Sequence, residues 1–196
     1  MVLSDADIIE RIGDGSLVIE PYDESNVEPA SVDIRLGDSF KEPIKTGRIV
    51  DTRASSGGCP HDDCDCGSPM ATESQPYREF EADSIVLEPG DSILATTFET
   101  IEIPDDLCAD AVGRSSLGRL FVSIHETAGF CDPGFSGEVT LEMTNENPNP
   151  VRLHAGDRVC QIVFKELSSP ALNPYGHDGS QYQNQTGATE SGMSFE

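Results

Sequence analysis

The chain has 196 residues and a formal net charge of −24, because 36 Asp and Glu residues outnumber 12 Lys and Arg residues. This length suits one domain, residues 1–196, rather than two. The charge argues against nucleic acid as a partner, since phosphates need cations, and no apolar stretch is long enough to predict a membrane span. The N-terminus lacks the basic start of a signal peptide, so we expect a cytoplasmic protein.

The acidity of the chain indicates adaptation to strong salt rather than disorder. Apolar runs such as residues 159–164 argue against a disordered chain. The lysines are Lys41, Lys45 and Lys165 alone. A folded, lysine-poor, acid-coated protein is typical of a halophilic host, because strong salt screens its self-repulsion.

The predicted elements begin with a short helix and continue as strands. Ser4 and Asp7 form a candidate capping box, and isoleucines then recur at helical spacing until Gly13. A strand is predicted at 17–19, and another at 31–36 ends at Gly37. Further strands are predicted at 85–87, 93–98, 101–103, 120–124, 139–143 and 159–164. This pattern predicts an all-β distorted barrel or jelly roll.

A weak internal sequence similarity supports a sheet that curls on itself. Residues 87–93 and 153–159 each place a Gly-Asp turn between two β-rich runs, as hairpins would. Two regions lie outside the strand pattern. Residues 51–83 are rich in Ser, Gly, Asp and Cys and resemble an irregular insertion, whereas residues 175–196 resemble a flexible tail that is too polar to pack on its own barrel.

Two segments could carry chemistry. Residues 113–119, Gly-Arg-Ser-Ser-Leu-Gly-Arg, set two hydroxyls between two arginines, a combination that suits a phosphate chain, although this segment alone favours a turn with two surface arginines. Residues 125–137 form a tight Gly- and Pro-rich loop before a strand in which Val139, Leu141 and Met143 face the core. Glu142 then points to the other face, where a carboxylate is ordinary in an acidic protein.

Together these motifs resemble the dCTP deaminase family, a branch of the dUTPase-like trimers. The resemblance extends to Pro-Ala-Ser-Val-Asp-Ile-Arg-Leu-Gly at 29–37, to Gln-Ile-Val-Phe at 161–164, and to Tyr175 with residues 182–187. It covers nearly the whole chain except the insertion. It implies a homotrimer with shared active sites, with dCTP and dUTP as ligands.

The resemblance also implies a role for each motif residue. Glu142 would take a proton from water and return it, while Ser115 and Arg119 would hold the water and stabilise the tetrahedral centre. Asp132 would meet the deoxyribose 3′-hydroxyl. The wider nucleotide-binding set would comprise Arg114, Ser116, Leu117, Gly118, Ala128, Thr140, Leu141, Gln161, Tyr175, Gln181 and Gln185.

Two features qualify this assignment. Gln181 stands where the family commonly has Lys, which removes a charge directed at the phosphates. Gly129 and Phe130 resemble the bifunctional members that continue to dUMP and diphosphate, because a small Gly129 would leave room for a second water beside the α-phosphate. A tight loop that needs a positive φ explains Gly129 as well. The alternatives are therefore a deaminase that stops at dUTP and a non-catalytic, nucleotide-binding regulator.

The metal expectations follow from the same residues. The His-x-Glu and Pro-Cys-x-x-Cys signature of zinc deaminases is missing, so we expect no catalytic zinc, and Mg²⁺ bound through the triphosphate alone. Cys59, His61, Cys64 and Cys66 could hold a zinc ion, although their spacing is unusual and a disordered insertion explains them too. Cys108, Cys131 and Cys160 stand singly beside apolar residues and are predicted to lie in the core.

Overall fold

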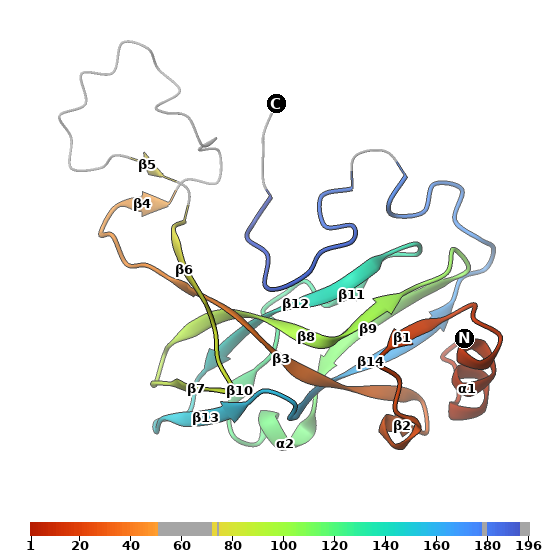
Figure 1. Cartoon of the computed structure of the whole chain (residues 1–196), viewed down its shortest axis with the longest axis horizontal. Coiled ribbons are helices and arrows are strands. Elements are labelled where there is room, and N and C mark those ends of the chain that lie inside the picture. Colours follow the sequence, from red (N-terminus) through yellow and green to blue (C-terminus); the bar gives the residue numbers. More distant parts are fainter. Residues whose placement is uncertain (51–71, 74, 178–179, 193–196) are drawn as a thin grey trace, which may run out of the picture.

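The computed structural model describes residues 1–50, 72–73, 75–177 and 180–192, and it is built almost wholly from β-strands (Figure 1). The Cys59–Cys66 group therefore lies outside the described residues. Among the described residues, the main sheet has ten strands, and its central path runs in the order β10-β12-β8-β3-β14-β9-β11. No helix within these ranges is long and apolar enough to cross a membrane.

The elements of the main sheet follow the chain from β1 to β14. These are β1 (Val18–Glu20), β2 (Val27–Glu28), β3 (Ser31–Pro43), β6 (Tyr77–Glu81), β8 (Ser92–Glu102), β9 (Leu107–Gly113), β10 (Val122–Ser123), β11 (Phe130–Cys131), β12 (Ser136–Asn145) and β14 (Arg158–Glu166). Two small pairings lie apart: β7 (Ser84–Leu87) with β13 (Val151–His154), and β4 (Ile49–Val50) with β5 (Thr72–Glu73). The helices are α1 (Asp5–Gly13), α2 (Ser115–Gly118) and a 3₁₀ turn at Glu24–Asn26.

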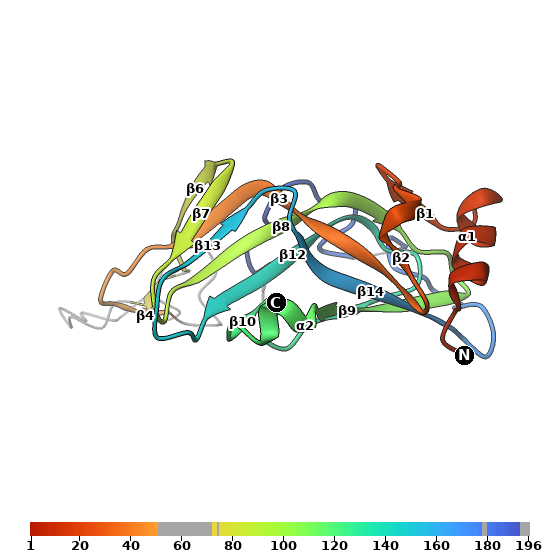
Figure 2. The same ribbon diagram turned by 90° about the horizontal axis from the view of Figure 1, so that it is seen from below.

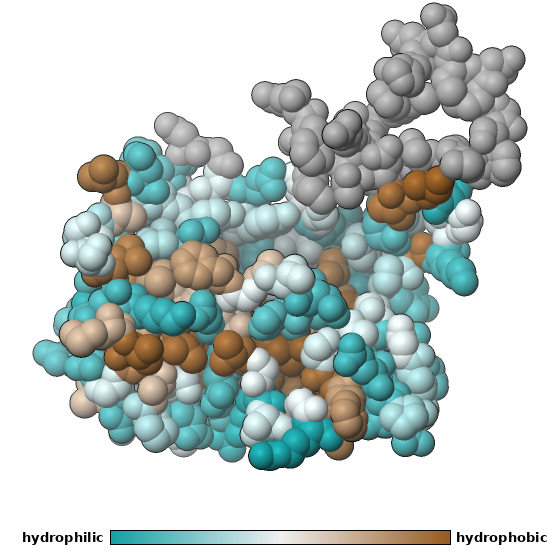
Figure 3. Space-filling model, turned by 180° about the vertical axis from the view of Figure 1, so that it is seen from behind, coloured by the Kyte–Doolittle hydropathy of each residue, from teal (hydrophilic) through white to brown (hydrophobic). Residues whose placement is uncertain are grey.

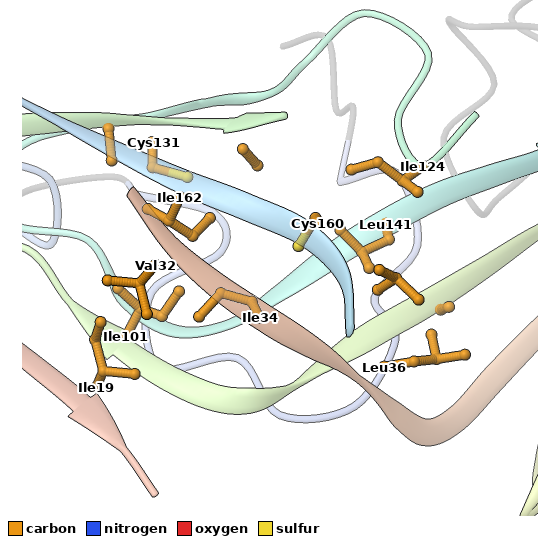
Figure 4. Packing of buried hydrophobic residues seen from close by; sticks show 14 of the residues in the cluster. Ile19, Val32, Ile34, Leu36, Ile101, Ile124, Cys131, Leu141, Cys160 and Ile162 are labelled. Carbon is orange, nitrogen blue, oxygen red and sulfur yellow. The ribbon is translucent and has the colours of Figure 1, made fainter. Parts of the chain in front are cut away.

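The sheet curls on itself, with α1 at one end and the β7–β13 pair at the other (Figures 1 and 2). Strand β3 is central to this curl, because it pairs with β14 through Ile34 and with β8 through Leu36. The concave side is filled by one hydrophobic cluster in which Ile34, Leu141 and Ile162 are fully buried (Figure 4). The predicted all-β distorted barrel is confirmed.

The predicted core cysteines are confirmed as buried. Cys108, Cys131 and Cys160 are free thiols in the described core, and Cys160 has no exposed surface. Burial raises the pKa of Cys131 to about 12 and raises that of Cys160 as well, because desolvation penalises the thiolate. Cys131 and Cys160 are therefore protonated packing residues rather than nucleophiles, and Cys108 is buried in the same core.

Helix α1 begins as predicted. The backbone N–H of Asp7 donates to Ser4 Oγ at 3.3 Å, and Asp7 Oδ2 accepts from the Ser4 N–H at 3.0 Å, which completes a capping box. Ile8 is fully buried, and Arg11 forms an ion pair with Asp106 at 2.7 Å. The helix thereby closes one end of the sheet.

Several predicted boundaries were wrong. Strand β3 does not end at Gly37 but continues to Pro43, and the register to β8 shifts between Leu36 and Phe40. A Cβ on Gly37 would lie 2.7 Å from Thr96 Cγ2, so this glycine permits a close approach of two strands rather than a turn. The strands predicted at 93–98 and 101–103 are one strand, β8, while β9, β11 and β13 were not predicted.

The echoed turns are real, but they are not hairpins. Gly90 and Gly156 both have positive φ, near +86° and +87°. The strand before each turn, β7 or β13, pairs with the other rather than with the strand that follows it. The two turns therefore carry the chain from the small β7–β13 pair into the main sheet at β8 and β14.

The edges of the two irregular regions also differ from the prediction. Tyr77–Glu81 forms β6 and pairs with β3, so regular structure resumes before residue 83. The described part of the tail packs on its own chain: Glu138 donates its N–H to the Gln185 carbonyl at 3.0 Å, and the Asn184 N–H donates to the Ser136 carbonyl at 2.7 Å. The prediction that the tail is too polar to pack on its own barrel was therefore wrong: hydrogen bonds attach the tail, Tyr175 packs against the core and Ala188 is buried.

Candidate functional site

The segment with two serines and two arginines forms the exposed turn α2. Arg114 is its N-cap and Arg119 its C-cap, and strand β9 delivers the chain to this point. The side chains of Ser115, Ser116 and Arg119 make no hydrogen bond within the described part of the chain, so their donors are available to a ligand. A hollow of about 250 Å³ beside the turn is lined by Arg114, Ser115, Gly118, Ser123 and His125.

Arg114 differs from the other residues of the turn because its guanidinium group forms an ion pair with a buried carboxylate. Its Nη2 lies 3.1 Å from Oδ2 of Asp33 on β3, a carboxylate with no exposed surface. Gln161 on β14 is the register partner of Asp33 and donates its Nε2–H to Asp33 Oδ1 at 3.2 Å. One buried carboxylate therefore connects two residues of the predicted nucleotide-binding set.

Strand β12 carries a polar stripe made of Glu138, Thr140, Glu142 and Thr144. At one end the tail is attached: the Gly187 N–H donates to Glu138 Oε2 at 2.7 Å, and the Thr140 and Thr189 hydroxyls lie 2.8 Å apart. At the other end the Thr144 hydroxyl donates to Glu126 Oε1 at 2.7 Å. Among these four side chains, Glu142 alone has no hydrogen bond to a described residue.

The core side of the same strand corrects one site residue. Leu141 and Met143 are fully buried, as the alternation predicted. The Leu141 side chain therefore contacts the core rather than a nucleotide, and only its backbone could reach a ligand. Leu117 of α2 is half-buried and packs against the same cluster.

The tail brings Tyr175 to the loop that carries Asp132. The Tyr175 N–H donates to the Pro133 carbonyl at 2.7 Å, and its ring lies 6.1 Å from that of Phe135. Asp132, Tyr175, His177 and Ser180 line a hollow of about 440 Å³. Farther along, Gln185 Nε2 donates to the Glu138 carbonyl at 2.6 Å, while Gln181 is exposed.

The loop at 125–130 lies tightly against β9. The Ala111 N–H donates to the Gly129 carbonyl at 2.6 Å. A Cβ on Gly129 would lie 2.5 Å from the Ala111 carbonyl oxygen and 3.0 Å from His125 Nε2. The glycine is therefore required by close packing within the chain rather than by a positive φ, and this packing explains the glycine without a role for a second water. Ala128 and Phe130 beside it are exposed.

Within one chain the predicted site residues form separate groups. In Figure 1 the tail with Tyr175 and Gln185 runs along one side of the sheet, whereas α2 with Ser115 and Arg119 lies at the opposite side. Glu142 lies on β12 between Thr140, which contacts the tail, and Thr144, which pairs with β10. Sequence reasoning missed Asp33 as a site residue, although Asp33 stands inside a quoted motif between the core residues Val32 and Ile34.

The chain is similar to known proteins over most of its length. Residues 2–167 match the family described as dCTP deaminase-like. The chain belongs to this family. It is 47% identical over 192 residues to a dCTP deaminase of Halorubrum lacusprofundi, covering 95% of this chain and 88% of the relative. It is 43% identical over 194 residues to the "dCTP deaminase, dUMP-forming" of Methanosphaera stadtmanae, covering 95% of this chain and 90% of that one.

The fold of the family is also seen in a solved structure. The 2′-deoxycytidine 5′-triphosphate deaminase of Agrobacterium tumefaciens matches with a TM-score of 0.60 and 23% sequence identity, covering 85% of this chain and 48% of that chain. At this identity the likeness supports the fold alone. Family membership makes the α2 turn, the 125–137 loop and β12 the segments to test for activity.

Proposed function

We propose that this protein is a hydrolase that removes the amino group of dCTP as ammonia and continues to dUMP and diphosphate. Relatives named dCTP deaminase, at 43–47% identity across most of the chain, support the substrate. The observation that carries the proposal is Glu142, a half-buried carboxylate without a hydrogen bond in the described chain, set in a stripe of bonded polar side chains. A carboxylate so placed is available to move a proton.

The chemistry assigned to these residues is an addition followed by an elimination. Water adds to C4 of the cytosine, the C4–N bond breaks, and the nitrogen leaves as ammonia while C4 becomes a carbonyl. Glu142 takes the proton from the water and returns it, which serves both steps. Ser115 and Arg119 hold the water and stabilise the oxygen of the tetrahedral centre, since their side chains are unbonded within the described chain.

The remaining residues bind the nucleotide. Arg114 and Gly118 face the triphosphate from the hollow beside α2, and Ser116 and the Leu117 backbone contribute from the same turn. Asp132 takes the 3′-hydroxyl and Gln161 lies beside the nucleotide. Tyr175, Gln181 and Gln185 contact the nucleotide from the tail. Ala128, Thr140 and the Leu141 backbone lie beside the cytosine base. These groups suit phosphate oxygens and a nucleoside rather than a metal ion.

Magnesium enters this scheme with the substrate. The phosphate-facing groups are guanidinium and hydroxyl groups, so Mg²⁺ would be held by phosphate oxygens and water. When bound there, Mg²⁺ would neutralise charge on the departing diphosphate. No step of the deamination assigned to Glu142 requires a protein-bound metal.

We place the complete site between subunits of a homotrimer. The separation of the tail from α2 within one chain supports this arrangement, because a site that needs both must draw them from different copies. Large hydrophobic side chains are exposed at Phe98, Phe121 and Phe130, and hydrophobic residues form a band across the face in Figure 3. We further place the enzyme in the cytoplasm of a host with high internal salt, where a net charge of −24 is screened.

The nucleotide product distinguishes a bifunctional enzyme, which forms dUMP and diphosphate, from a deaminase that forms dUTP. A deaminase that stops at dUTP is the alternative, and the packing of Gly129 against Ala111 keeps it open, because that packing explains the glycine without a second water. The experiment is incubation with dCTP and Mg²⁺ in strong salt, with ammonia measured and the nucleotides separated. We expect ammonia with dUMP and diphosphate. Ammonia with dUTP alone would leave a monofunctional deaminase, and tight dCTP binding without ammonia would indicate a regulator.

A further inference from the structure

A buried carboxylate lies under the α2 turn and contacts two arginines. Asp33 has no exposed surface, and its Oδ2 lies 3.1 Å from Arg114 Nη2 and 3.4 Å from Arg158 Nη1. Burial of a charged carboxylate costs free energy unless a cation lies beside it. The Asp33 carboxylate therefore keeps the Arg114 and Arg158 guanidinium groups close to it. Arg114 is further oriented by donating from Nη1 to the Arg158 carbonyl at 3.3 Å.

The arginines of this cluster outnumber the carboxylates that they contact. Arg114 and Arg158 share Asp33, and the exposed Asp23 attracts Arg158 electrostatically without a salt bridge. The Arg114 and Arg158 side chains are 27% and 43% exposed, so both reach solvent. Asp33 Oδ2 accepts no well-directed hydrogen bond from Arg114 or Arg158. The N–H groups of the two guanidinium groups can therefore donate to another acceptor. An anion is the ligand that such a pair lacks.

A neighbouring ion pair shows that this excess is not a general feature of the sheet. Glu99, also buried, accepts from Arg35 Nε at 2.6 Å and from the Arg35 backbone N–H at 2.9 Å. The Arg35 guanidinium also lies over the Phe98 ring at 4.5 Å. Arg35 and Glu99 are thus joined by direct, well-directed hydrogen bonds, although Arg35 is the register partner of Arg158.

We infer that Asp33 is a positioning residue that aligns Arg114 and Arg158 as a pair of cations for the triphosphate. This inference rests on the proposed function, because it takes the triphosphate of dCTP as the anion. It adds Arg158, which no motif singled out, to the phosphate-binding residues. Asp33 also orients Gln161 through Oδ1, so one carboxylate sets the β14 side of the nucleotide site.

The mechanism predicts a change in affinity that depends on the phosphate chain. Without the Asp33 charge, the Arg114 and Arg158 guanidinium groups repel each other. They then move away from the positions in which both could bind one phosphate chain. Arg158 itself contributes charge-assisted hydrogen bonds to the phosphate. Loss of either should therefore weaken dCTP and leave dCMP, which lacks the β- and γ-phosphates, nearly unchanged.

The test compares Asp33→Asn and Arg158→Ala with the control Glu99→Gln, which alters the neighbouring buried pair. Binding of dCTP and dCMP is measured by calorimetry, together with kcat and KM for ammonia release and the melting temperature. We expect the dCTP-to-dCMP affinity ratio to fall about ten- to hundredfold in Asp33→Asn and Arg158→Ala. KM should rise more than kcat falls, Arg158→Lys should recover part of the loss, and Glu99→Gln should leave the ratio unchanged.

The wild-type enzyme is measured first, which separates the two claims. No ammonia from dCTP with the wild type would overturn the proposed function and this inference together. Normal wild-type turnover with an unchanged affinity ratio in Arg158→Ala and Asp33→Asn would overturn the inference alone. If Asp33→Asn does not fold, Arg158→Ala decides, because the Arg158 side chain is 43% exposed and outside the core.

Discussion

Two glutamates on strand β12 differ in their hydrogen bonding. Glu138 accepts from the Thr96 hydroxyl at 3.2 Å and from the Gly187 N–H at 2.7 Å, and so attaches the tail to the sheet. Glu142, two side chains farther along the same face, has no such partner in the described chain. The bonded carboxylate attaches the tail, and the unbonded one is the carboxylate to which we assign the proton transfer.

At the residue scale, the packing of Gly129 leads to a direct prediction. Gly129→Ala would push a methyl group to 2.5 Å from the Ala111 carbonyl oxygen, a backbone atom that cannot rotate away. We expect the free energy of unfolding in urea to fall by about 1–3 kcal/mol. Gly13→Ala is the control, because a Cβ there meets nothing within 4 Å.

Unchanged stability in Gly129→Ala, with dUMP formation lost, would contradict the packing explanation. It would instead support the role of Gly129 in making room for a second water. A fall in stability of the expected size, with the same products as the wild type, would show that this glycine belongs to the fold and not to the choice of product.

The site residues divide into those that sequence could predict and those that needed coordinates. Arg114, Ser115, Arg119 and Glu142 stand in ordered motifs, and the resemblance of these motifs to a known family was what selected them. Asp33 was not selected, because an aspartate in a strand is ordinarily solvated. Its burial depends on β14 and α2, which are distant in sequence and meet only in the folded chain.

At the scale of elements, the capping box of α1 is open to measurement. Ser4→Ala removes the acceptor of the Asp7 N–H and should lower the free energy of unfolding by about 1 kcal/mol at neutral pH. The Ser4 hydrogen bonds lower the pKa of Asp7, so the box stabilises the fold at neutral pH and loses this effect as pH falls through that lowered pKa. Urea unfolding at two pH values, with the exposed Ser168→Ala as control, measures it.

An effect of Ser4→Ala that stayed constant from neutral pH to below the Asp7 pKa would contradict this account. It would mean that the Asp7 carboxylate contributes nothing to the cap and that the Ser4 hydroxyl acts alone.

Strands were easier to predict than their ends. Runs of β-branched residues located most of the sheet, because alternation follows from having one buried face. The end of β3 was misplaced since Gly37 resembles a terminator, and only its neighbour Thr96 on β8 shows why a glycine is needed there. Tyr77–Glu81 was included in the insertion because composition, rather than pairing with β3, defined that boundary.

At the scale of the whole molecule, the separated groups of site residues predict an assembly. If Tyr175 and Gln185 act with Ser115 and Arg119, more than one chain must contribute to each site. Light scattering in strong salt should therefore give three times the chain mass of 21.1 kDa. A monomer that retained full ammonia release would contradict the shared site, because α2 and the tail lie at opposite sides of one chain.

The central claim is that Glu142 performs the deamination of dCTP, and one comparison tests it most directly. Ammonia release from dCTP is measured for the wild type and for Glu142→Gln, with dCTP affinity measured on both by calorimetry. An amide keeps the shape and hydrogen bonding of the carboxylate but cannot shuttle a proton, so we expect unchanged affinity and a loss of turnover of about 10²- to 10⁴-fold. Turnover by Glu142→Gln close to that of the wild type would contradict the account.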